Sequence, residues 1–171
     1  MKQAKVLIAR ENGAYHVKVE GRATFECSPP LRNFANSLDE HDCKGIFIDL
    51  SGCVGMDSTF MGILAMIGLK AKKLGSLVSI VNASDNNKNL LNGLGLQKIF
   101  TYTTTSEIES HQRWMDAGTS IDKTEKAETV LIAHETLMEV DKQNIPKFQN
   151  VVDFVKKDLQ KEENKDTHHN T

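Results

Sequence analysis

The first twenty residues contain two short β-prone segments, Lys5–Arg10 and Tyr15–Glu20. They are separated by Glu11–Ala14, in which Asn12 and Gly13 favour the positive φ angles that a tight turn requires. The pattern therefore predicts that the chain begins with an antiparallel β-hairpin.

A helix is predicted after Gly21. Ser28 can serve as its N-cap, and Pro29 and Pro30 suit the first helical turn. Apolar residues then recur at helical spacing, at Leu31, Phe34, Ala35 and Leu38. Together these signals define the first helix.

The apolar run Gly45–Leu50 has no polar face, which is typical of a central strand covered on both sides. Ser51–Gly52 is a turn signal, and we expect the strand to end there. Asp57–Thr59 can then cap a second helix that stops at Gly75. The apolar positions of this helix are Phe60, Leu64, Ile67, Ala71 and Leu74.

Four more elements are predicted before residue 118. Ser76–Val81 has central-strand character, and Ser84 or Asp85 can cap a third helix. Ile99–Thr103 has the composition of a last strand, and Ser106–Ala117 that of a fourth helix. The order β-β-α-β-α-β-α-β-α predicts an α/β fold: a mixed sheet with an initial hairpin, covered by about four helices over residues 1–117.

The remainder of the chain has a different pattern. Residues 118–126 are polar and read as a linker, and residues 127–161 carry two amphipathic helical stripes. We expect these helices to pack on the domain, on each other or on a second chain. Val151, Val155 and Leu159 are the candidates for a homodimer contact. Residues 162–171 are charged or polar, and we expect them to be disordered.

Charge and hydropathy narrow the functional classes. The 171 residues include 21 Lys and Arg against 23 Asp and Glu, a formal charge of −2 that makes nucleic acid a poor partner. No apolar run approaches the roughly 20 residues that span a bilayer. We expect a soluble, cytoplasmic protein without a signal peptide or a membrane span.

The sequence offers little for catalysis or metal binding. The three cysteines, Cys27, Cys43 and Cys53, are too widely spaced for a paired metal or redox motif, and they fit reduced, buried thiols. The histidines do not form ligand pairs, and paired carboxylates are absent from the sequence pattern. Asp49, at the predicted strand end, reads as an organiser of the following loop. We therefore expect no enzyme, no metal and no cofactor.

The sharpest motif is the junction of the buried strand ending in Asp49-Leu50, a short loop, and Asp57–Thr59 opening a helix. This pattern resembles the STAS domains of bacterial anti-sigma factor antagonists. The resemblance covers about residues 4–117 and includes Gly21 and the element Gly95–Ile99. Residues after Gly118 have no counterpart in the short antagonists.

The resemblance implies a partner-switching cycle. A GHKL-type kinase anti-sigma factor would phosphorylate Ser58, a phosphatase would reverse the modification, and the unmodified form would bind the anti-sigma factor and free the sigma factor. A helix start suits a phosphoserine, because the first-turn N–H groups and the helix dipole stabilise the added negative charge. The implied partner-binding residues are Asp57, Ser58, Thr59, Phe60, Met61 and Gly62.

The chain departs from the family pattern just after the motif. Where the resemblance implies Gly-Leu-Gly, the chain has Phe60, Met61 and Gly62. A side chain at position 60 would change how closely a partner approaches. Two alternatives therefore stand beside the switch: an ordinary N-cap at Asp57–Thr59, and a STAS scaffold subunit of a signalling or lipid-transport complex without phosphoryl switching.

Overall fold

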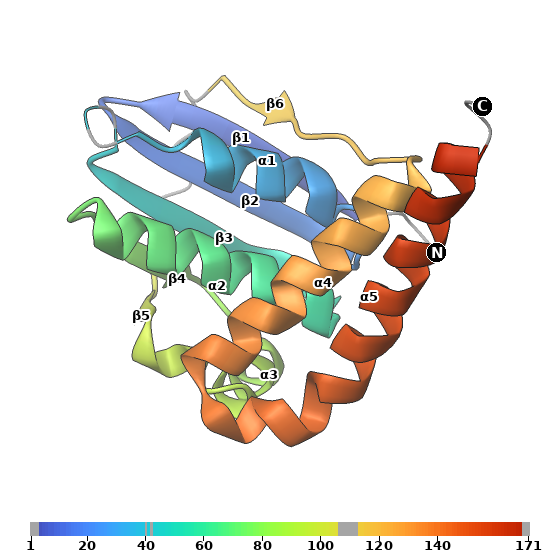
Figure 1. The fold of residues 1–171 in the computed structure, drawn as a ribbon. Coiled ribbons are helices and arrows are strands. Elements are labelled where there is room, and N and C mark those ends of the chain that lie inside the picture. Colours follow the sequence, from blue (N-terminus) through green and yellow to red (C-terminus); the bar gives the residue numbers. More distant parts are fainter. Residues whose placement is uncertain (1–3, 40, 42, 106–112, 169–171) are drawn as a thin grey trace.

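The computed structural model describes residues 4–39, 41, 43–105 and 113–168 (Figure 1). Within these residues six strands form one mixed sheet in the order β5-β4-β3-β2-β1-β6. The strands are β1 (Lys5–Glu11), β2 (Ala14–Ala23), β3 (Gly45–Met56), β4 (Val78–Val81), β5 (Thr101–Thr103) and β6 (Met115–Asp116). Strands β2 to β5 run parallel to one another, whereas β1 is antiparallel to both of its neighbours. The predicted mixed α/β sheet is confirmed.

The initial hairpin forms where the sequence predicts it. Asn12 and Gly13 have φ angles of 52° and 83°, so both central turn residues adopt the left-handed conformation. The flanking strands pair from Lys5 with Glu20 to Glu11 with Ala14. The turn residues therefore set the register of β1 on β2.

The helices gather on one face of the sheet (Figure 1). They are α1 (Ser28–Ser37), α2 (Ser58–Lys73), α3 (Asp85–Gly93), α4 (Lys123–Val140) and α5 (Ile145–His168), with short 3-10 helices at Leu96–Lys98 and Lys142–Asn144. Helices α1 and α2 lie on the sheet, α4 crosses over both of them, and α5 runs beside α4 (Figure 1). The C-terminal hairpin thus forms a further layer on the helical side.

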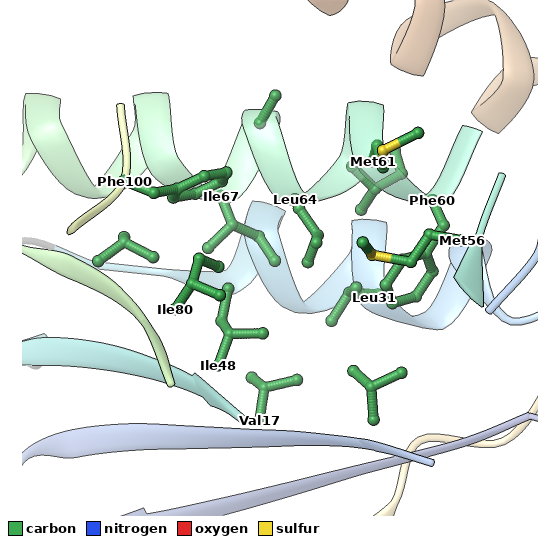
Figure 2. Packing of buried hydrophobic residues seen from close by; sticks show 14 of the residues in the cluster. Val17, Leu31, Ile48, Met56, Phe60, Met61, Leu64, Ile67, Ile80 and Phe100 are labelled. Atoms are coloured by element: carbon green, nitrogen blue, oxygen red, sulfur yellow. The ribbon is translucent and has the colours of Figure 1, made fainter. Parts of the chain in front are cut away.

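The core lies between α2 and the strands. Val17, Ile48 and Ile80 from three neighbouring strands are fully buried and point toward α2 (Figure 2). On the opposite side of β3, Phe47 is 40% exposed and stacks on His16 with ring centroids 5.2 Å apart. The prediction that this strand is covered on both sides was therefore wrong for its outer face.

Strand β3 is longer than its sequence pattern predicts. Ser51–Gly52 does not end it, because β3 stays paired with β2 as far as Met56, opposite Ala23. Register shifts in this pairing mark irregularities beyond Lys18. The extension carries the chain directly to the start of α2.

The C-terminal boundaries also differ from the predictions. Met115–Asp116 forms β6, not the end of a helix, and residues 106–112 of that predicted helix lie outside the described residues. Helix α4 begins at Lys123, inside the predicted linker, and α5 continues to His168 through residues expected to be disordered. Lys and Glu are strong helix formers, so a charged composition does not by itself prevent a helix. Among the described helices, none is long and apolar enough to cross a membrane.

Candidate functional site

Asp57 joins two segments at the start of α2. Its Oδ1 accepts a hydrogen bond from the backbone N–H of Phe60 at 2.8 Å, which makes Asp57 the N-cap. Its Oδ2 accepts one from the backbone N–H of Phe25, also at 2.8 Å, in the loop after β2. One carboxylate thus positions both the helix start and the adjacent loop. The predicted cap at Asp57 is confirmed.

Ser58 is the first residue of α2, is half-buried and contacts the C-terminal hairpin. Its Oγ lies 2.8 Å from Nε2 of His134 in α4. The other ring nitrogen, Nδ1, lies 2.7 Å from the carbonyl oxygen of Val130. A carbonyl oxygen only accepts, so Nδ1 carries a hydrogen; in the neutral imidazole, Nε2 then accepts the hydrogen of the Ser58 hydroxyl. The hydrogen bonds therefore hold both side chains in a defined orientation.

The three residues after Ser58 are buried, with Phe60 and Met61 on opposite sides of α2 (Figure 2). Thr59, Phe60 and Met61 are all buried, and Phe60 is fully so. Figure 2 shows Phe60 beneath α2, close to Met56 and Leu31. Although the sequence motif includes these side chains, they belong to the packing of the domain and offer no surface to a partner in this conformation.

Gly62 lies where α2 and α4 approach most closely. A Cβ at this position would be 2.4 Å from the carbonyl oxygen of Ala133 and 2.7 Å from its Cβ. Both distances are far below van der Waals contact, so only glycine permits this approach. The surface at Gly62, the glycine that the motif retains, is therefore covered by α4 of the same chain.

Polar contacts hold the first half of α4 on α1. Arg32 Nη1 donates to Thr129 Oγ1 at 3.3 Å and lies 3.7 Å from a carboxylate oxygen of Glu128. Asn33 donates to Glu125 at 3.4 Å. These are long, partly exposed contacts, and contacts of this kind contribute little to stability.

The end of α4 and the start of α5 are held near α3. Asn144 is buried, and its Nδ2 donates to the carbonyl oxygens of Leu94 at 2.9 Å and Leu137 at 2.8 Å. Lys98 donates to Asp141 at 2.9 Å. This hydrogen bond is the main reason why the pKa of Asp141 is lowered. The elbow of the hairpin is thus fixed more firmly than its beginning.

The remaining candidate residues, Asp49 and the three cysteines, do not form a further site among the described residues. Asp49 Oδ1 accepts a hydrogen bond from the backbone N–H of Ser51 at 2.8 Å, but both residues lie within β3, so the prediction that Asp49 organises a loop after the strand was wrong. Cys27, Cys43 and Cys53 are free and buried, and burial raises the pKa of Cys27 to about 11. In the described part of the chain, no three His, Cys, Asp or Glu side chains come together as metal ligands.

His134 is the site residue that sequence reasoning missed. It lies 76 positions after Ser58, on a helical stripe that the pattern explains as ordinary packing. The available signal was a histidine among the apolar residues of an amphipathic helix. That signal does not say which surface the helix covers, so the pairing with Ser58 required the tertiary structure.

The fold and the capped start of α2 define an α/β protein with a one-sided helical layer. The sequence model of the STAS domain matches residues 8–110, and the chain belongs to this family. Helices α4 and α5 begin after the matched residues. A comparison with curated protein sequences gives no match.

Similar solved structures are anti-sigma factor antagonists. The unphosphorylated form of SpoIIAA is 12% identical, with a TM-score of 0.52 over 62% of this chain and 93% of that one. An antagonist from Mycobacterium paratuberculosis is 22% identical, with a TM-score of 0.52 over 61% of this chain and 88% of that one. A putative antagonist from Thermotoga maritima is 14% identical, with a TM-score of 0.51 over 60% and 88%. At these identities the likeness is one of fold.

Proposed function

We propose that this chain is an anti-sigma factor antagonist that binds a kinase anti-sigma factor at the start of α2, under the control of phosphorylation at Ser58. One observation carries the proposal. Ser58 is the first residue of a helix capped by Asp57, on a STAS fold shared with solved antagonists. The proposed role is non-catalytic and acts in the control of sigma-factor-dependent transcription.

Physical chemistry supports Ser58 as the phosphoacceptor. A phosphoserine adds about −1.5 to −2 charge, and the positive end of the α2 dipole favours that charge. Ser58 is half-buried, with its Oγ against His134 of α4, whereas Thr59 is buried. A partner that binds over a phosphate at this position would have to remove water from it, which costs about a few kcal/mol. Because about 1.4 kcal/mol changes affinity tenfold, the phosphate would weaken binding by a large factor.

The test uses the full chain, a GHKL-type kinase anti-sigma factor from the same genome and ATP, with the phosphorylated residue mapped by mass spectrometry. We expect phosphate on Ser58 and none in the Ser58→Ala chain. Ser51→Ala is the matched control, because Ser51 is exposed in the preceding part of β3. Equal labelling of the Ser58→Ala chain would remove Ser58 from the proposal, and no labelling of any chain would contradict the kinase partnership.

One observation favours a second function, a STAS scaffold subunit without phosphoryl switching. The α4–α5 hairpin covers Ser58, while Phe154 on α5 is 70% exposed and free to contact another chain. Purification from native cells separates the two functions. Co-elution with an ATPase–permease complex would favour the scaffold, and co-elution with a kinase would favour the switch.

A further inference from the structure

We infer that the α4–α5 hairpin is a gate over Ser58: the docked hairpin excludes macromolecules from the start of α2, and local opening admits them. Such a gate would regulate the proposed site, and so its biological meaning rests on the proposed function. The gate itself is a physical property of the chain and is testable without any partner.

The docked hairpin occupies the surface that a partner would need. His134 lies within hydrogen-bond distance of Ser58, and Ala133 packs without a gap on Gly62. A second protein segment cannot lie on these residues while α4 remains in place. Binding of a partner there and docking of α4 are therefore mutually exclusive.

The hairpin is less deeply buried than the domain it covers. Helix α4 buries four residues, and only two of them, Ala133 and Leu137, are apolar. Val152 is the one buried residue of α5. Segments with few buried apolar contacts open at lower free energy than the core. The hairpin is thus the part of the helical layer that we expect to open first.

Docking also leaves a polar atom unsatisfied. The Nε of Arg32 is buried and has no hydrogen-bond partner among the described residues, and Nη1 of the same side chain contacts Thr129 and Glu128 of α4. A buried donor without a partner is unfavourable relative to the same donor in water. Opening of α4 exposes this atom, which lowers the cost of opening.

The covalent connection makes the gate reversible. Residues 118–122, which precede α4, form neither helix nor strand, so the hairpin can move while it stays tethered. A tethered segment competes with a partner at high effective concentration. The apparent affinity of the partner is therefore its affinity for the open form multiplied by the fraction of molecules that are open.

The experiment measures access to position 58 in the full chain. Ser58→Cys places a thiol there, and its labelling is compared for N-ethylmaleimide and for a maleimide that carries a polyethylene glycol chain. Ser58 is half-buried, so the small reagent can approach the docked form, whereas the polymer requires opening. Cys27, Cys43 and Cys53 report unfolding, because all three are buried in the domain.

Variants that weaken docking should raise polymer labelling specifically. Ala133→Leu forces side-chain atoms against Gly62, and Asn144→Ala removes two hydrogen bonds at the elbow, far from Ser58. We expect each to increase the polymer rate at the introduced thiol about tenfold or more, which corresponds to a tenfold larger open fraction. Glu139→Leu, at an exposed position of α4, is the matched control and should leave the rate unchanged.

Two results would overturn the gate. One is an equal polymer rate in the parent Ser58→Cys chain and in both weakened chains. The other is labelling of Cys27 and Cys53 together with position 58, because the start of α2 would then become accessible only by unfolding of the whole domain. Neither result depends on a kinase, so a failure of the gate is distinguishable from a failure of the proposed function.

Discussion

Helices α2 and α4 meet at Gly62 and Ala133 but are held in the structure in different ways. Ten residues of α2 are buried, including Phe60, Ile63 and Leu64, whereas α4 buries four residues, of which two are polar. Hydrophobic burial is the main stabilising contribution to folding, so α2 is an integral part of the domain and α4 is an attachment to it. The site lies between a firm element and a weakly held one, which suits a surface that must be covered and uncovered.

The largest expected effect tests the firm side of this comparison. Phe60→Ala removes a fully buried aromatic ring and should lower the free energy of unfolding by about 3–5 kcal/mol. Phe154→Ala is the matched control, since Phe154 is 70% exposed on α5, and the change should stay within about 0.5 kcal/mol. Urea denaturation measures both. Equal losses would contradict the assignment of Phe60 to the core.

A smaller effect tests the contact between the two helices. Gly62→Ala brings a Cβ against the carbonyl oxygen of Ala133 and should destabilise the docked hairpin by about 1–3 kcal/mol. Gly93→Ala is the matched control: no heavy atom lies within 4 Å of its would-be Cβ, so stability should be unchanged or raised by up to about 1 kcal/mol. Hydrogen exchange of the α4 amides measures the free energy of docking of α4 on α2. A Gly62→Ala chain with unaltered exchange would refute the close approach.

The hydrogen bond across the site should contribute less. In a double-mutant cycle with Ser58→Ala and His134→Phe, we expect a coupling of about 0.5–1.5 kcal/mol in the free energy of hairpin opening. The same cycle with Ser51→Ala should give no coupling, because no contact joins Ser51 to His134 among the described residues. The hydrogen bond from the backbone N–H of residue 51 to Asp49 remains possible in this variant. A coupling near zero between Ser58 and His134 would mean that the bond contributes nothing to docking.

The smallest effect is a pH dependence at the elbow. The pKa of Asp141 is lowered from 3.8, so its contribution to docking is complete above that value and is lost as the pH falls through the lowered pKa. We expect amide exchange at the start of α5 to accelerate in acid beyond its intrinsic pH dependence. In Asp141→Asn, which keeps the shape of the side chain, this extra acceleration should disappear. If it persists, another group controls the elbow.

The sequence predicted the features that depend on neighbouring residues. Asn12 and Gly13 determine the hairpin turn because positive φ angles are a local requirement, and Asp57 caps α2 because its carboxylate reaches a backbone N–H three residues away. Gly62 is also part of the sequence motif. The pattern does not show why a glycine is required there, since the requirement comes from the close approach of Ala133.

The features that were missed depend on distant partners. Strand β3 continues beyond Ser51–Gly52 because β2 is there to pair with it, and no local signal reports a pairing partner. Helix α4 has an apolar stripe that fits many surfaces, so its position on α2, and with it the Ser58–His134 contact, follows only from tertiary packing. Residues 162–168 were predicted to be disordered from their charge, although their helix propensity favours continuation of α5.

Native-state hydrogen exchange of the unmodified full chain tests the central claim most directly, since it compares α2 and α4 in the same molecules. We predict that amides of Lys123–Val140 exchange through a local opening during which Ser58–Lys73 stays protected, so that the opening free energy of α4 is clearly lower than that of α2. A single opening free energy shared by both helices, equal to that of global unfolding, would contradict the claim.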